Sequence, residues 1–286
     1  MKLAAAPISW GVCEVPDWGL QLAAERVLSD MRALGVHATE AGPPGFLPAD
    51  PTMTRALLDT RGLQLIGGFV TAVLHERDRR ADELASVKRR ATWLAAAGAE
   101  LLVLAPALAQ TGYSGAAEIS DAAWPSLFDG IDRVAEIADA TGLGVAVHPH
   151  WGTAIERRHH IERFLEGSVH ALCLDTGHMA LGGADPLKVA RDAGARVRHV
   201  HLKDVDGPLA RRVREGSLTY DDSVRAGLFR PLGDGAARIE DVLRELRTME
   251  YVGWYVLEQD VMLDREPAPG PPEWVERSAA YARKHG

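Results

Sequence analysis

Residues 145–204 contain three apolar runs that each end in a polar cluster: Val145-Ala-Val-His148-Pro149-His150, Ala171-Leu-Cys-Leu-Asp175-Thr176-Gly177-His178 and Val197-Arg-His199-Val-His201-Leu-Lys203-Asp204. Short aliphatic runs bounded by Gly and Pro are typical of buried parallel strands. A fourth run, Gly253-Trp254-Tyr-Val-Leu-Glu258-Gln259-Asp260, ends in the same way. We therefore expect these imidazoles and carboxylates to meet at the carboxyl-terminal rim of one sheet or barrel.

The rest of the chain alternates between predicted strands and helices. Four further strands are predicted at Leu3–Gly11, Val36–Glu40, Leu63–Val70 and Leu101–Pro106, and helices at Leu20–Leu34, Met53–Arg61, Arg77–Ala97, Trp124–Thr141, Arg157–Leu165, Pro186–Ala193, Arg238–Thr248 and Pro272–Lys284. This alternation favours an α/β fold with one closed (β/α)8 TIM barrel over residues 1–286. The competing doubly wound sheet would carry a glycine-rich phosphate loop, and we find none. The irregular stretch Val205–Gly235 predicts a lid, a binding loop or extra helices over the active rim.

Composition limits the partners. The net charge of −8 argues against a nucleic-acid surface and favours a small-molecule or protein partner. No apolar run reaches the roughly 18 residues that a membrane span needs, and the first residues do not resemble a signal peptide, so we expect a cytoplasmic protein. Two cysteines are too few for a disulfide framework. Apolar helices outside a barrel are compatible with a homodimer.

The alternation of side chains along a strand places His148 with His150, and His199 with His201, on one face each. Buried carboxylates at strand ends need a compensating charge, which a metal ion can supply. Asp175, His201 and Glu258 are therefore the expected metal ligands. The alternative for Asp175 is a turn or helix N-cap.

Other polar residues near the same rim have two readings each. Glu156 is either a fourth ligand or catalytic base, or a first-turn charge that complements a helix dipole. Lys203 could polarise a substrate oxygen, whereas Asp204 points away and would anchor a loop. Glu40 ends the second strand and could bind a substrate hydroxyl.

Aromatic residues and further histidines complete the candidate site. Trp10 and Trp151 are expected in rim loops, where they would either face a sugar ring or pack internally. The pair His159-His160 falls on a predicted helix and is expected at the surface. The mixture of carboxylate and imidazole ligands favours Mn²⁺ or Co²⁺, with Mg²⁺ and Zn²⁺ as alternatives.

At these residues the chain resembles the xylose-isomerase-like sugar isomerase/epimerase superfamily of TIM barrels, and more narrowly the inosose dehydratases of inositol catabolism. The resemblance is carried by Ala6-Pro7-Ile8-Ser9-Trp10-Gly11-Val12, Ala38-Thr39-Glu40-Ala41-Gly42-Pro43, His148-Pro149-His150-Trp151-Gly152-Thr153-Ala-Ile-Glu156, Leu174-Asp175-Thr176-Gly177-His178, His199-Val-His201-Leu-Lys203-Asp204 and Glu258-Gln259-Asp260. One departure matters: the epimerases usually carry a glutamate at the fifth strand end, where this chain has His148. The resemblance thereby implies a dehydratase rather than an epimerase, with Glu156 or His148 as the fourth ligand.

The resulting hypothesis is a metal-dependent lyase acting on a cyclic polyol ketone such as 2-keto-myo-inositol (scyllo-inosose). Glu156, His148 or His150 would remove the proton next to the carbonyl, and an imidazolium such as His178 or His150 would protonate the departing β-hydroxyl. A ketose isomerase or epimerase would use the same enediolate. A phosphodiesterase and a non-catalytic sugar-binding protein are further alternatives.

Overall fold

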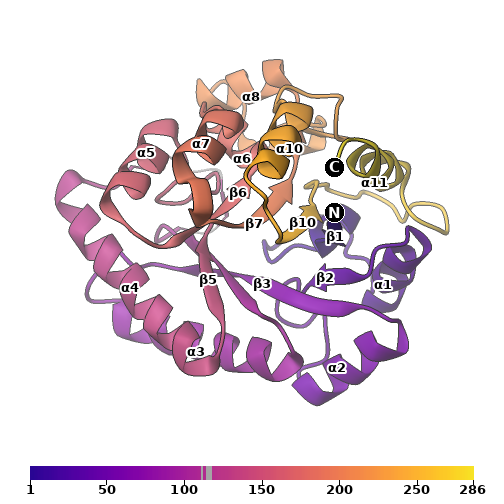
Figure 1. Ribbon diagram of the computed structural model, residues 1–286, viewed down its shortest axis with the longest axis horizontal. Helices are drawn as coiled ribbons and strands as arrows, with labels where there is room; N and C mark the ends of the chain where they lie inside the picture. The colour runs from indigo at the N-terminus through magenta and orange to yellow at the C-terminus, as the bar shows by residue number, and fades with distance from the viewer. Residues whose placement is uncertain (111, 114–117) are drawn as a thin grey trace.

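The computed structural model describes residues 1–110, 112–113 and 118–286, and in these ranges eight parallel strands close into a barrel (Figure 1). The predicted (β/α)8 architecture is confirmed. Around the barrel the strands follow the order β1-β10-β7-β6-β5-β4-β3-β2. They are β1 (Lys2–Ala5), β2 (Ala38–Glu40), β3 (Gln64–Ala72), β4 (Leu101–Pro106), β5 (Gly144–Val147), β6 (Ala171–Asp175), β7 (Val197–Leu202) and β10 (Trp254–Leu257).

Helices surround the barrel on its outer side (Figure 1). They are α1 (Ala24–Ala33), α2 (Pro51–Thr60), α3 (Arg80–Ala97), α4 (Trp124–Thr141), α5 (Arg158–Gly167), α6 (Thr176–Leu181), α7 (Pro186–Ala193), α10 (Ile239–Thr248) and α11 (Glu273–His285), with short 3₁₀ turns at Pro7–Trp10, Asp121–Ala123 and Gly194–Arg196. No helix in the described ranges is long and apolar enough to cross a membrane.

The first strand is shorter than the sequence predicts. The expected strand Leu3–Gly11 ends at Ala5, and Pro7–Trp10 forms a 3₁₀ turn instead. Proline has no N–H to donate to a strand ladder, and its fixed φ suits the start of a helical turn. Gly11, with φ 80°, then ends the turn in the left-handed region.

The barrel interior is filled by small side chains. Val103, Ala146 and Cys173 form one buried cluster, and Ala4, Ala38 and Val256 belong to another. Because side chains alternate, the residue two positions later on a strand points inward as well. This places polar residues above a layer of small apolar ones, at the carboxyl-terminal end of the barrel.

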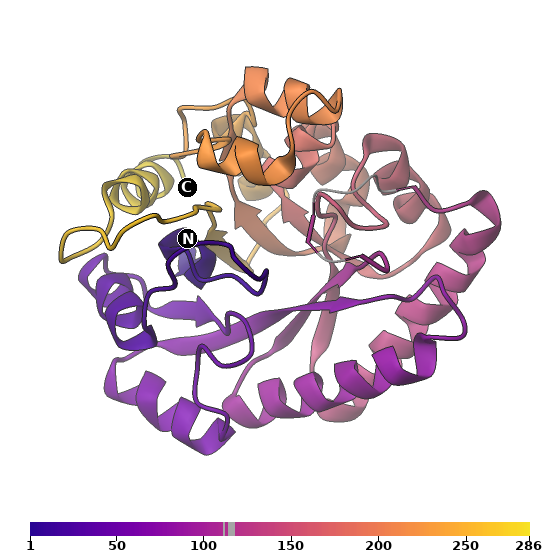
Figure 2. The ribbon, with the colours of Figure 1, turned by 180° about the vertical axis from the view of Figure 1, so that it is seen from behind.

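The stretch after β7 folds back as an insertion, residues 204–235. It contains the antiparallel pair β8 (Asp204–Val205) and β9 (Phe229–Arg230) and two helices, α8 (Gly207–Arg214) and α9 (Tyr220–Arg225). Figure 2 shows its helices, in orange, on the side of the molecule nearer the viewer. The prediction of extra helices in this stretch is confirmed.

Asp204 holds the far end of this insertion. Its carboxylate accepts hydrogen bonds from the backbone N–H groups of Gly233, Gly235 and Ala237. The prediction that Asp204 anchors a loop is therefore confirmed.

Candidate active site

Four strands deliver one side chain each to a common point at the rim. His148 Nε2 lies 3.3 Å from Asp175 Oδ2, which lies 3.5 Å from His201 Nδ1. His201 Nδ1 in turn lies 3.0 Å from Glu258 Oε2. The three residues expected as ligands thus converge, and His148 joins them.

Each carboxylate in this cluster keeps one oxygen for the common point. Asp175 Oδ1 accepts from the backbone N–H of His178 at 2.7 Å, which leaves Oδ2 facing the two imidazoles. Glu258 Oε1 accepts from Lys203 Nζ at 2.6 Å, which leaves Oε2 facing His201. Asp175 is also the N-cap of α6, so the N-cap role that the sequence left open is observed while Oδ2 stays directed at the imidazoles.

The chemistry of the donor set fits a divalent ion. His201 Nδ1 is buried and makes no hydrogen bond, while the Nε2 atom of the same ring is 2.8 Å from Glu40 Oε1. A carboxylate that holds the distal N–H of an imidazole fixes the tautomer in which the other nitrogen can bind a metal. Burial raises the pKa of Glu258 to about 7 despite His201 and Lys203, so a further cation would stabilise its charged form. Two imidazoles and two carboxylates suit Mn²⁺, Co²⁺ or Zn²⁺.

Glu40 supports this cluster from β2. Its Oε1 also lies 2.7 Å from His199 Nε2, so one carboxylate oxygen accepts from both histidines of β7. Burial would raise the pKa of Glu40, but its contacts with His201 and His199 hold it well below its usual range. Glu40 also lines the pocket described below, where the sequence placed a substrate-binding residue.

Glu156 does not join the four converging side chains, and this corrects its expected role as ligand or base. Its Oε2 accepts from the backbone N–H of Gly152 and its Oε1 accepts from Arg157 Nε at 2.9 Å. Both oxygens thus close the loop that follows β5, and Glu156 is absent from the residues that line the pocket. At the end of the fifth strand, where the epimerases usually carry a glutamate, His148 itself takes that place in the cluster.

Asp175-Thr176-Gly177-His178 joins the ends of β6 and β7. The Thr176 hydroxyl accepts from the Lys203 N–H at 2.9 Å and donates to the Lys203 carbonyl at 2.7 Å. A Cβ at Gly177 would lie 2.4 Å from Lys203 Cγ, so glycine makes room for the lysine stem. This motif therefore places the Lys203 ammonium beneath the site.

Lys203 does not face the substrate pocket, which corrects its expected role of polarising a substrate oxygen. Its fully buried ammonium contacts Glu258 Oε1 at 2.6 Å, Asp260 Oδ1 at 2.8 Å and His178 Nε2 at 3.0 Å. An ammonium has three N–H donors, and these partners use all of them. Burial would lower the pKa of Lys203, but the surrounding carboxylates raise it, so the side chain stays charged and holds Glu258 and Asp260 in place.

The rings of His150 and His178 are in contact, with centroids 3.7 Å apart and planes tilted by 38°. Burial lowers the pKa of both rings well below the usual value. His148 and Lys203 lower the pKa of His150 further, and His150 and Lys203 lower the pKa of His178 further. His150 Nδ1 is 2.7 Å from the carbonyl of Trp151, so Nδ1 carries the proton and Nε2 keeps its lone pair. Burial therefore favours the neutral ring at both positions before any proton is taken from a substrate, and an imidazolium at either position would have to form during the reaction.

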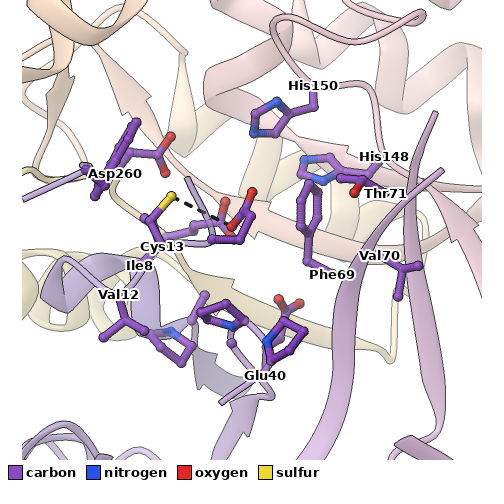
Figure 3. Close-up of a pocket in the computed structure, with 18 of the residues that line it drawn as sticks. Ile8, Val12, Cys13, Glu40, Phe69, Val70, Thr71, His148, His150 and Asp260 are labelled. Atoms are coloured by element: carbon purple, nitrogen blue, oxygen red, sulfur yellow. Dashed lines mark hydrogen bonds between the residues drawn. The ribbon is translucent and has the colours of Figure 1, made fainter. Parts of the chain in front are cut away.

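A cavity of about 250 Å³ opens beside the converging side chains, and His148 and Glu258 line it. In Figure 3, His148 and His150 lie on one side of the open space and Asp260 on the other, with Phe69 next to His148 and Glu40 below them. Its apolar walls come from Phe69, Trp18, Tyr113 and Tyr220. A small cavity with a few convergent polar groups is the usual form of a small-molecule site.

The expected aromatic walls Trp10 and Trp151 are not part of this cavity. Trp10 is fully buried and its indole N–H donates to Asp30. Trp151 is 5% exposed, and the guanidinium of Arg157 lies over its indole, 4.9 Å from the ring centroid. Both residues pack internally, which was the alternative reading for each.

Sequence reasoning missed the aromatic residues that do line the cavity. Tyr113 follows β4, and Tyr220 comes from the insertion, so neither lies near a strand-end motif. His160 was also misplaced, because it is 3% exposed and its Nδ1 accepts from the backbone N–H groups that open α5. His159 lies at the surface as expected.

A model of the xylose isomerase-like TIM barrel family matches residues 28–285. The chain is 31% identical over 271 residues to an inosose dehydratase of Geobacillus kaustophilus, covering 91% of this chain and 87% of that protein. It is 32% identical over 268 residues to the rhizopine catabolism protein MocC of Rhizobium meliloti, covering 91% and 82%.

Two solved structures have the same fold. The probable 3-DHS dehydratase AsbF of Bacillus anthracis superimposes with a TM-score of 0.75 at 15% identity, over 100% of both chains. D-allulose 3-epimerase of Methylomonas sp. gives 0.71 at 17% identity, over 100% of this chain and 97% of that one. At these identities the likeness shows the fold alone.

Proposed function

Since the chain belongs to the xylose isomerase-like TIM barrel family, we propose that it is a metal-dependent dehydratase that removes water from a cyclic polyol ketone of the inosose type. The observation that carries this proposal is the convergence of His148, Asp175, His201 and Glu258 below a cavity that the unprotonated nitrogen of His150 can serve. The named inosose dehydratases at about 30% identity support the substrate class.

The four converging residues would hold the divalent ion, with Mn²⁺ or Co²⁺ as our choice for mixed nitrogen and oxygen donors. When bound, the ion supplies Lewis-acid polarisation of a ketone oxygen, which acidifies the neighbouring C–H bond. Glu40 and Lys203 would orient the ligands from behind, since each contacts one of them directly.

His150 is the base in this proposal. Its Nδ1–H is committed to the Trp151 carbonyl, and the ring lines the cavity, so Nε2 can take the proton from the carbon next to the carbonyl. The electron pair of the broken C–H bond then forms the C=C bond as the β-hydroxyl leaves. The protonated His150 returns its proton to that hydroxyl, which departs as water.

One ring can perform both transfers on a polyol of this type. In scyllo-inosose all hydroxyl groups are equatorial, so the hydrogen on one carbon and the hydroxyl on the next lie on the same face of the ring. His178 is a poorer donor, because it is 1% exposed, does not line the cavity and has its Nε2 against Lys203.

The walls of the cavity would keep water from the reacting atoms. The ring of Tyr113 lies 4.4 Å from that of His150, and Phe69 packs against His150 at 5.6 Å. These contacts fix the plane of the imidazole and cover its faces. Exclusion of water also keeps the lone pair of His150 free for the substrate.

The test is to incubate metal-loaded protein with scyllo-inosose and to follow the ultraviolet absorbance of the diketone product and its enol form. We expect absorbance to grow with Mn²⁺ or Co²⁺, to stop after chelation and to be lost in Asp175→Asn. Absence of the signal, together with exchange of a ketohexose C–H for solvent deuterium, would favour an epimerase instead. A protein that retains no stoichiometric metal and turns over neither substrate would favour a sugar-binding role.

A further inference from the structure

A chain of buried hydrogen bonds joins the insertion, residues 204–235, to the metal cluster. Tyr220 of α9 donates from its hydroxyl to Asp260 Oδ2 at 2.6 Å. Asp260 Oδ1 accepts from Lys203 Nζ at 2.8 Å, and Lys203 Nζ donates to Glu258 Oε1 at 2.6 Å. Glu258 Oε2 is the oxygen that faces His201 Nδ1.

We propose that Tyr220 is a positioning residue for the metal ligand Glu258, so that docking of α9 and binding of the divalent ion strengthen each other. The inference rests on the proposed metal centre and not on the identity of the substrate. Tyr220 acts through Asp260 and Lys203. Among the described hydrogen bonds and ring contacts, it has none with the four converging side chains, which are those of His148, Asp175, His201 and Glu258.

The proposal follows from how the donors and acceptors are matched. Lys203 has three N–H groups and three acceptors, so its position depends on all of them. Asp260 Oδ1 keeps its position against the Lys203 ammonium only if Asp260 Oδ2 also has a hydrogen-bond donor, and the Tyr220 hydroxyl is that donor. In a buried site a missing partner leaves a charged oxygen unpaired, which is costly enough to move the group.

Packing places the hydroxyl with little freedom. Tyr220 is 1% exposed, and its ring contacts Trp18, Tyr113, Phe229 and His178 at centroid distances of 6.2–6.4 Å. The start of α9 is fixed by Thr219, whose hydroxyl accepts from the Asp222 N–H. A helix held in this way presents Tyr220 to Asp260 only when the insertion is docked.

Thermodynamic linkage makes the coupling reciprocal: if a docked α9 favours the ion, the ion favours a docked α9. The proposal therefore predicts two effects of equal sign. Loss of the Tyr220 hydroxyl weakens metal binding, and metal binding protects the insertion from local opening.

The first experiment measures the affinity of the full chain for Mn²⁺ and Co²⁺ by equilibrium dialysis, and records the visible absorption of bound Co²⁺. We expect Tyr220→Phe to weaken binding about tenfold, the lower end for loss of an outer-shell partner, and to change the Co²⁺ spectrum. The matched control is Tyr251→Phe, which removes a hydroxyl that bonds only to the Trp254 carbonyl among the hydrogen bonds described, and should change neither.

Two further variants separate positioning from simple loosening. Val224→Ala removes packing of α9 but keeps every donor and acceptor of the hydrogen-bond chain, so it should weaken metal binding through poorer docking and leave the spectrum of the bound Co²⁺ unchanged. Asp260→Asn should weaken binding, and adding Tyr220→Phe to it should weaken binding no further, because both changes break the same chain.

The second experiment is hydrogen exchange over residues 204–235 with and without Mn²⁺. We expect slower exchange with the ion in the wild type and a smaller difference in Tyr220→Phe. Unchanged metal affinity in Tyr220→Phe, additive effects with Asp260→Asn, or a wild type that binds neither ion would each overturn the proposal. Weakened binding in a protein that does not dehydrate scyllo-inosose would uphold it while refuting the proposed function.

Discussion

Replacing Lys203 with methionine tests whether the buried charges under the site depend on one another. The side chain is fully buried, with its ammonium 2.6 Å from Glu258, 2.8 Å from Asp260 and 3.6 Å from Asp175. Methionine has a similar unbranched stem and removes the charge with little change in packing. Three buried carboxylates would then lose their shared cation.

The magnitude follows from these distances. At an effective dielectric constant of about 20, a pair 2.6 Å apart attracts by about 6 kcal/mol, and the pair at 3.6 Å by about 5 kcal/mol. Most of this attraction offsets the loss of hydration of the buried charges. Removal of one partner from a buried ion pair destabilises proteins by about 3–5 kcal/mol, and we expect Lys203→Met to fall in that range.

The assay is urea unfolding of metal-free protein at pH 8 and pH 5. The loss should be smaller at pH 5, because burial already raises the pKa of Glu258 and this carboxylate takes up a proton in the variant. The control is Lys188→Met, which breaks an exposed pair with Asp192 and should not change stability measurably. The smallest expected loss in the free energy of unfolding is about 3 kcal/mol. A Lys203→Met protein whose free energy of unfolding stays within about 1 kcal/mol of the wild type at both pH values would refute the reasoning.

Three further predictions concern the loop after β5. His150→Gln should lower kcat with scyllo-inosose by about 10²–10⁴-fold and leave the affinity for Mn²⁺ unchanged, because the base is lost and the metal ligands remain. Steady-state kinetics and equilibrium dialysis measure the two quantities, and a parallel loss of metal affinity would contradict the prediction. Burial raises the pKa of Glu156 to about 7 from an ordinary value of 4.5, so the folded state binds this proton more tightly than the unfolded chain. The stability of the wild type relative to Glu156→Gln should therefore be highest below pH 4.5 and fall by about 3 kcal/mol as pH rises through 7, measured by urea unfolding; a flat difference would exclude the shift. Gly152→Ala should lower stability by about 1–3 kcal/mol and raise KM. Gly152 has φ 76°, and a Cβ there would lie 2.5 Å from the Cα of Tyr113, whose ring covers His150. Thermal unfolding and KM values that match the wild type would disprove the contact.

Much of the fold is local information that the sequence carries. Aliphatic runs ending in polar residues marked the strands, and α4 and α7 begin and end where their patterns predict. β1 ends earlier than the sequence pattern predicts, because Pro7 has no N–H to donate to the strand ladder.

The sequence also determined that Asp175, His201 and Glu258 meet, because parallel strands in a closed barrel bring their carboxyl ends to one rim. It could not decide between His148 and Glu156 as their neighbour. That choice depends on a loop in which Glu156 pairs with Gly152 and Arg157, partners that residue spacing does not reveal.

Tertiary structure alone decided the roles of residues whose partners are distant in sequence. Lys203 reads as a rim residue by strand alternation, yet its ammonium is held below the rim by Glu258 and Asp260, more than fifty residues away. Tyr220 lies in an irregular stretch with no strand or motif to mark it, and only packing of the insertion brings its hydroxyl to Asp260. Strand periodicity fixes which way a side chain starts, whereas the position of its charged end depends on the free energy of the contacts that the folded chain supplies.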